Sequence, residues 1–110
     1  MIRLTVENAL SKLEGQDLPF KELFAHGTLA VEIYKPVGED LQTPHSRDEI
    51  YVVIAGSGYF QKGDSVEPFE AGEVLFVKAG VAHRFVDFTD DFATWVFFYG
   101  PEGGESGRAG

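Results

Sequence analysis

Two residues with metal-binding side chains, His45 and Glu49, lie four positions apart at the start of an apolar, β-branched stretch. In an extended strand, positions i and i+4 point to the same face, so both side chains can reach one ion. A third such residue, His83, begins another strand-like segment far along the chain. Two imidazoles and one carboxylate are a usual donor set for divalent Fe, Mn, Ni, Co or Zn. The alternative for each histidine is a hydrogen-bonded place in an apolar core.

The segments that must position these residues are short strands separated by turns. Alternation and β-branched or aromatic content predict eight of them, at residues 20–24, 29–34, 49–55, 59–60, 67–69, 73–77, 83–88 and 92–99. This number of short strands indicates an all-β sandwich or barrel. Residues 56–58, Gly-Ser-Gly, are expected to form a hairpin turn. The 49–55 strand is apolar on both faces, which predicts burial by a second layer or a second subunit.

One short helix is expected at residues 5–13, with Thr5 as its N-cap and Gly15 just beyond its end. The glycine-rich end of the chain has almost no apolar residues and is expected to be flexible. The predicted organisation is an N-terminal helix and linker, a barrel and a flexible tail, at residues 1–19, 20–100 and 101–110.

Composition limits the class of protein. A chain of 110 residues fits one domain, and its net charge of −9 argues against nucleic acid or an anionic membrane surface as partner. The absence of cysteine excludes disulfides and a thiolate zinc site. No stretch approaches the roughly 20 apolar residues of a membrane span, and the first residues lack the apolar core of a signal peptide. These features predict a cytoplasmic protein.

The spacing of His45, Glu49 and Gly56 resembles the second half of the first cupin motif. In that motif a glutamate follows the second histidine of a His-x-His pair after three or four residues, and a glycine follows six residues later. Thr43 stands where the first histidine of the pair would be. An alignment that makes His45 the first histidine, with Arg47 in place of the second, is disfavoured because it puts Glu49 too close.

A second stretch resembles the other cupin motif, which reads Gly, five residues, Pro-x-Gly, two residues, His, three residues, Asn. Gly72, Gly80 and His83 match it, whereas Lys78 replaces the proline and Asp87 the asparagine. The resemblance covers about residues 29–99. It implies a jelly-roll barrel, also called a double-stranded β-helix. It further implies a three-ligand metal site formed by His45, Glu49 and His83, and a homodimer, as small cupins usually form.

Residues near the ligands are expected to line a pocket for a small, partly apolar molecule, namely Tyr34, Gln42, Thr43, Arg47, Tyr51 and Phe85. Plain core packing is the alternative for Tyr51 and Phe85, and Glu32 is expected to be solvated. Glu49 is the candidate catalytic residue, because the equivalent glutamate of some related cupins also acts as a base. The resemblance implies dioxygenase-like or isomerase- or lyase-like chemistry on an oxygenated molecule. The alternative is a non-catalytic binding or sensing module.

Overall fold

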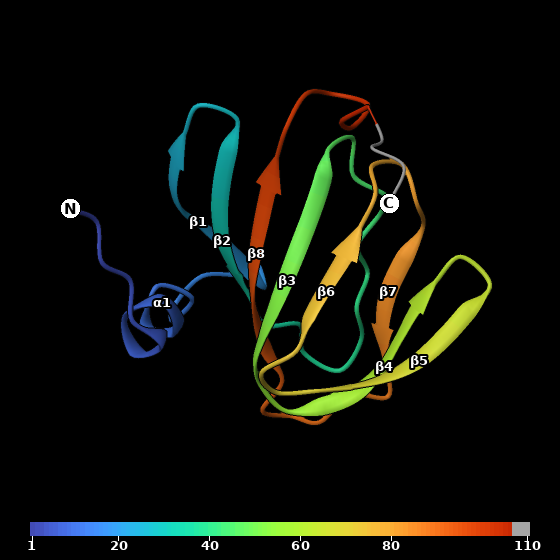
Figure 1. Ribbon diagram of the computed structural model, residues 1–110. Coiled ribbons are helices and arrows are strands. Elements are labelled where there is room, and N and C mark those ends of the chain that lie inside the picture. Colours follow the sequence, from blue (N-terminus) through green and yellow to red (C-terminus); the bar gives the residue numbers. More distant parts are fainter. Residues whose placement is uncertain (107–110) are drawn as a thin grey trace.

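The structure, a computed structural model, describes residues 1–106 as two antiparallel sheets with a short helix beside the larger one (Figure 1). The elements in chain order are α1 (Val6–Ser11), β1 (Phe20–His26), β2 (Leu29–Tyr34), β3 (Asp48–Ala55), β4 (Ser57–Lys62), β5 (Ser65–Glu70), β6 (Val74–Val77), β7 (His83–Val86) and β8 (Ala93–Tyr99). The five-stranded sheet has the order β1-β2-β8-β3-β6, and the three-stranded sheet has the order β5-β4-β7. The expected all-β jelly-roll class is confirmed.

Both sheets contribute to one aromatic core. Alternate residues of β3 point inward, so Tyr51 and Val53 are buried, whereas Ile50 and Val52 on the other face are half-buried. The three-stranded sheet supplies Phe60, Phe69 and Phe85, and the core is completed by residues that include Phe92 and Val96. Glu49, near the start of β3, points to the same side of the strand as Tyr51 and Val53. Its side chain therefore lies next to this core.

The prediction of a hairpin turn at residues 56–58 is wrong. β3 pairs with β6 and β8, whereas β4 pairs with β5 and β7, so the chain crosses from one sheet to the other at this point. Gly56 has a φ of 88°, and a Cβ there would lie 2.7 Å from the Cα of Phe92. A Cβ at Gly58 would lie 2.7 Å from the Cα of Phe88. Both glycines therefore allow the segment before β8 to pack against the crossing.

The expected helix is present but shorter. Thr5 caps α1 as predicted, because its hydroxyl accepts the backbone N–H of Asn8 at 3.1 Å. The helix ends at Ser11 and continues as single turns whose N–H groups bond three residues back. Ala9 is its buried residue, and Val6 is exposed. No helix within residues 1–106 is long and apolar enough to cross a membrane.

The end of the described chain folds back on the barrel. The N–H of Gly103 donates to the carbonyl of Ser46 at 2.6 Å, and the N–H of Glu105 donates to Oδ2 of Asp48 at 2.9 Å. Residues 101–106, expected to belong to a flexible tail, thus form hydrogen bonds beside the first ligand segment. The rest of the predicted tail, residues 107–110, lies outside the described residues.

Candidate metal centre

The three predicted ligands meet where the two sheets come together. His45 lies in the loop before β3, Glu49 is the second residue of β3, and His83 is the first residue of β7. Oε1 of Glu49 lies 2.9 Å from Nδ1 of His45 and 2.7 Å from Nε2 of His83. One nitrogen or oxygen atom from each residue lies within 4.8 Å of those of the other two. Residues far apart in sequence therefore form one compact donor cluster.

Backbone hydrogen bonds hold the two histidine segments together. The N–H of Gly80, in the turn before β7, donates to the carbonyl of His45 at 2.8 Å. Asp48 accepts the N–H of Ala79 through Oδ1 and that of Glu105 through Oδ2, each at 2.9 Å. These two backbone donors keep the pKa of Asp48 below its ordinary value, because they stabilise the ionised carboxylate. The loop that carries His45 and the turn that precedes His83 are thus fixed to one another.

The hydrogen bonds of His83 decide which ring nitrogen faces the cluster. Nδ1 lies 2.8 Å from the carbonyl of Val81, and a carbonyl only accepts, so this nitrogen carries the proton. Nε2 therefore presents its lone pair to Glu49 when the imidazole is neutral. A backbone carbonyl that fixes the tautomer in this way is a common partner of metal-ligating histidines.

Glu49 and His83 are both buried, and their charges favour one another. Burial alone would raise the pKa of Glu49, but hydrogen bonds to His45 and His83 outweigh it and hold that pKa below its ordinary value. Burial alone would lower the pKa of His83, but the hydrogen bonds to Glu49 and to the carbonyl of Val81 outweigh it and raise that pKa. The site thus favours an anionic carboxylate with positive charge close to it.

The donor cluster fits a divalent transition metal. Ligand atoms at about 2.1 Å from one ion and at right angles to each other lie about 3.0 Å apart. The two distances from Glu49 Oε1 to the histidine nitrogens, 2.7 and 2.9 Å, are close to this value. Oε2 of Glu49 is buried and has no hydrogen-bond partner within the described part of the chain. A buried carboxylate oxygen without a partner is costly, and a bound cation would satisfy it.

A cavity of about 410 Å³ opens beside His45 and Glu49. Four of the residues predicted to line a pocket do so: Tyr34, Gln42, Thr43 and Tyr51. Two others do not. Arg47 donates from its guanidinium to the carbonyl of Thr28, and Phe85, which is 1% exposed, packs in the core with its ring centre 4.9 Å from that of Tyr51.

The cavity wall also contains five residues that were not predicted from the sequence, namely Phe20, Glu32, Leu41, Val96 and Phe98. Glu32 was expected to be solvated, but it is half-buried beside Tyr34 on the inner face of β2. Burial is the main cause that raises its pKa, and repulsion from Glu22 adds to it. Strict alternation along β2 would have placed Glu32 inside, since Tyr34 is inside. Leu41 lies in an irregular loop, so no periodic pattern in the sequence could have predicted that it lines the cavity.

Asp40 is a further buried carboxylate, whose burial the sequence did not reveal. It is 1% exposed and accepts hydrogen bonds from the Tyr34 hydroxyl, the Phe85 backbone N–H at 2.9 Å and both the backbone and the side chain of Gln42. Oε1 of Gln42 in turn accepts a hydrogen bond from the Tyr51 hydroxyl, with the two oxygens 3.0 Å apart. A hydrogen-bonded chain therefore runs from Asp40 through Gln42 to the tyrosine beside the ligands.

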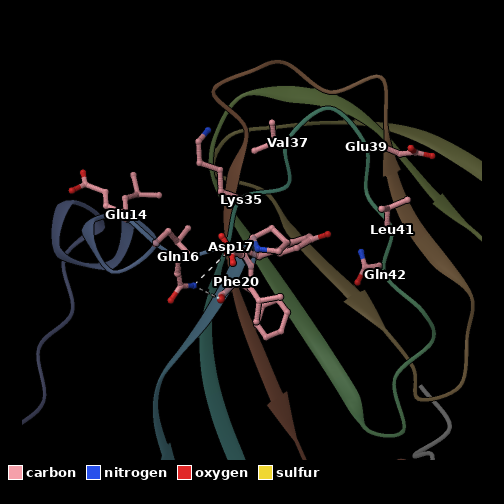
Figure 2. Close-up of a pocket in the computed structure, with 14 residues that line it drawn as sticks. Glu14, Gln16, Asp17, Phe20, Lys35, Val37, Glu39, Leu41 and Gln42 are labelled. Carbon is pink, nitrogen blue, oxygen red and sulfur yellow. Dashed lines mark hydrogen bonds between the residues drawn. The ribbon is translucent and has the colours of Figure 1, made fainter.

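A larger groove of about 780 Å³ adjoins this cavity (Figure 2). The two share Phe20, Tyr34, Leu41 and Gln42. Figure 2 shows Phe20 between Gln16, near the helix, and Gln42, on the loop that leads to the ligands. The side-chain amide of Gln16 donates to the carbonyl of Phe20 at 2.9 Å and so ties the linker to the start of β1. The groove gives the cavity an apolar extension toward α1.

Known proteins resemble this chain in sequence and in fold. An uncharacterized protein of Streptomyces coelicolor is 38% identical over 63 residues, which cover 57% of this chain and 60% of that relative, so the match spans less than two thirds of its length. Two crystal structures share the fold. A cupin-2 domain containing protein from Shewanella frigidimarina has a TM-score of 0.65 at 18% identity and covers 86% of this chain and 92% of that one.

The second structure is an uncharacterized conserved protein with a double-stranded β-helix domain from Klebsiella pneumoniae. Its TM-score is 0.71 at 17% identity, with 88% of each chain covered. The family model that describes the cupin domain matches residues 30–99, which include all three predicted ligands and most of the barrel. The chain belongs to the cupin domain family.

Proposed function

We propose that this cupin holds one divalent transition metal (Fe, Mn, Ni, Co or Zn) through His45, Glu49 and His83 and acts on a small oxygenated molecule. The observation that carries the proposal is the setting of Glu49. Its Oε1 lies between two imidazole nitrogens, and its Oε2 is buried without a partner among the described residues. A metal of this kind supplies Lewis acidity and, if it is redox-active, activates dioxygen.

The cavity supports a ligand that is polar at one end and apolar at the other. His45, Glu49 and the amide of Gln42 form a polar part of its wall, whereas Phe20, Val96 and Phe98 form an apolar part. The adjoining groove leaves room for a longer apolar substituent. Enediols, β-diketones and hydroxy acids have the required oxygen-rich end, and most ligand sites combine apolar walls with a few placed polar groups in this way.

The protein's own groups orient and deprotonate such a ligand. Glu49 would hold the metal, and its carboxylate would also be the group that accepts a proton from the ligand as general base. Phe20, Val96 and Phe98 place apolar surface beside the site, which strengthens the electrostatic interactions there. Removal of a proton from an oxygenated ligand by Glu49 would serve as a first step in both dioxygenase-like and isomerase- or lyase-like reactions.

Metal analysis tests the site itself. Purified protein should contain or take up one metal ion per chain, and His83→Ala and the isosteric Glu49→Gln should both lose it. His26→Ala is the matched control, because His26 is exposed at the end of β1 and lies outside the cluster. A folded wild-type protein that binds none of the five metals in equilibrium dialysis would contradict the proposal.

Activity measurements separate an enzyme from a binding module. The metal-loaded protein is incubated with enediols, β-diketones and hydroxy acids while oxygen uptake and isomerised or cleaved products are followed. Turnover that disappears in Glu49→Gln supports the enzyme. Metal-dependent binding of these compounds without any turnover would assign the non-catalytic role.

We also propose that the outer face of the five-stranded sheet is covered by a second copy of the chain. On this face Ile50 of β3 is paired with Phe97 and Phe76, and Val52 with Trp95 and Val74. Val74 is 65% exposed and Phe76 is 47% exposed. A continuous apolar sheet face of this kind is typical of an interface between subunits.

A further inference from the structure

We propose that the phenolic oxygen of Tyr51 is a fourth protein ligand of the metal, in compensation for the imidazole that Thr43 does not provide. The inference rests on the proposed metal site and adds to it a residue that the motif spacing does not point to. Tyr51 is two residues after Glu49 on β3, so the two side chains share the inner face of the barrel.

The position of the Tyr51 oxygen matches that of a ligand. It lies 3.0 Å from Nε2 of His83, close to the 2.7 Å from that nitrogen to Oε1 of Glu49. Both distances agree with the separation of about 3.0 Å that neighbouring ligands of one ion have. The donor atoms of His45, Glu49, His83 and Tyr51 therefore form a connected series of contacts at ligand spacing.

The direction of the Tyr51 proton follows from Asp40. A carboxylate only accepts, so the Gln42 side chain must turn its NH₂ group toward Asp40, with Nε2 2.6 Å from Oδ2. This leaves Oε1 of Gln42 toward Tyr51, whose hydroxyl donates to it at 3.0 Å. The lone pairs of the tyrosine oxygen are then left for the side where His83 and Glu49 lie.

Tyr51 and His83 thus face each other with acceptors. Nδ1 of His83 donates its N–H to the carbonyl of Val81, so Nε2 of the neutral ring is an acceptor. When the ring is neutral, these two acceptors lie 3.0 Å apart in a buried site, and their repulsion is removed by positive charge between them, either a proton on Nε2 or a bound metal ion. The metal that His45, Glu49 and His83 would hold is such an ion, and it would satisfy the tyrosine oxygen as well.

The surroundings of Tyr51 keep it in this position. It is 1% exposed, and its ring packs edge-on against those of Phe60 and Phe85, with centres 5.9 and 4.9 Å away. Asp40, the far end of the hydrogen-bonded chain, is anchored by the backbone N–H of Phe85. A tyrosine held by packing on its ring and by a hydrogen bond at its tip has little freedom to turn away.

Cobalt(II) titration tests this ligand, because its visible absorption reports the donor atoms and their number. We expect Tyr51→Phe to bind Co²⁺ roughly 10- to 100-fold more weakly than wild type, with an altered spectrum but the same stoichiometry. Tyr59→Phe is the matched control, since Tyr59 is 47% exposed on β4, and it should leave affinity and spectrum unchanged. Gln42→Met frees the Tyr51 proton to turn toward Glu49 and should weaken binding to an intermediate degree.

The outcomes separate this inference from the metal site on which it rests. Tyr51→Phe with wild-type affinity and spectrum overturns the inference and leaves the three-ligand site standing. A wild-type protein that binds no Co²⁺ refutes the metal site as well. A thermal melt of each variant checks its fold. If Tyr51→Phe does not fold, Gln42→Met decides, and wild-type affinity and spectrum in that variant overturn the inference.

Discussion

Asp48 accepts the backbone N–H of Ala79 at 2.9 Å and so joins the first residue of β3 to the turn before His83. Its other oxygen accepts the N–H of Glu105, from the returning end of the chain. Asp48 is 3% exposed and precedes Glu49 directly in the chain. The carboxylate therefore fixes three segments around the donor cluster without belonging to it.

Replacement of Asp48 by asparagine should destabilise the protein. Asparagine has one acceptor oxygen instead of two, so one of the two backbone N–H groups loses its charged partner. Hydrogen bonds to charged groups contribute roughly 1.5–3 kcal/mol, and we expect a loss of about that size in the free energy of unfolding, measured by urea denaturation. Asp64→Asn, at the exposed turn between β4 and β5, is the control. Equal stability of the two variants would show that the Asp48 contacts contribute nothing.

Glu32→Gln should change the pH dependence of stability. The folded protein raises the pKa of Glu32, chiefly by burial, so the folded state holds its proton more tightly than the unfolded state does. The stabilising contribution of Glu32 is full below its unfolded pKa of about 4.5 and is lost as pH rises through the folded pKa. We therefore expect Glu32→Gln to be more stable than wild type at neutral pH, with an advantage that shrinks toward pH 4. Denaturation of the metal-free proteins across this range measures it, and an advantage that is the same at every pH would refute the explanation.

Gly56→Ala and Gly63→Ala form a matched pair. Both glycines have positive φ, 88° and 58°, so alanine is strained at each by about 1–2 kcal/mol. A Cβ at Gly63 meets nothing within 4 Å, whereas one at Gly56 would lie 2.7 Å from the Cα of Phe92. Gly56→Ala should thus lower the melting temperature clearly more than Gly63→Ala. Similar shifts for the two variants would mean that the crossing between sheets relaxes easily.

The proposed subunit interface predicts a change in molecular mass. Val74→Lys and Phe76→Lys each place a charge on the outer face of the five-stranded sheet, where burial against a second copy would be costly. Light scattering after size-exclusion chromatography should give a dimer for wild type and a monomer for the double variant. Val66→Lys, on the other sheet, should remain dimeric. A wild-type monomer at micromolar concentration would contradict the interface.

Much of the barrel and the cluster of His45, Glu49 and His83 could be predicted, because each has a local signal. Strand alternation gave the exact bounds of β2, and the spacing of His45, Glu49 and Gly56 pointed to the donor cluster. Gly56 also shows the limit of such signals. A Gly-Ser-Gly stretch suggests a turn, but its glycines here permit close approach of a segment more than 30 residues away, which no local pattern reveals.

The network behind the ligands was beyond local reasoning for another reason. Asp40 lies in a polar loop with glycine and proline, where a carboxylate is normally exposed. Its burial depends on donors from Tyr34 on β2 and from Phe85 on β7, and these come together only in the folded barrel. Alternation correctly predicted that Phe85 shares the inner face of its strand with His83. Its complete burial depends on the aromatic rings that surround it in the folded barrel.

The hydrogen bond from Gly80 to the carbonyl of His45 has a consequence for how the cluster forms. It joins two main-chain atoms, and the donors to Asp48 are also main-chain N–H groups. The distance between the two histidine segments is therefore established when the barrel folds. A site that is already ordered loses little conformational entropy when an ion enters. Metal uptake should then leave the backbone almost unchanged. Little of the free energy of coordination would be needed to order the site, so nearly all of it should contribute to the binding affinity.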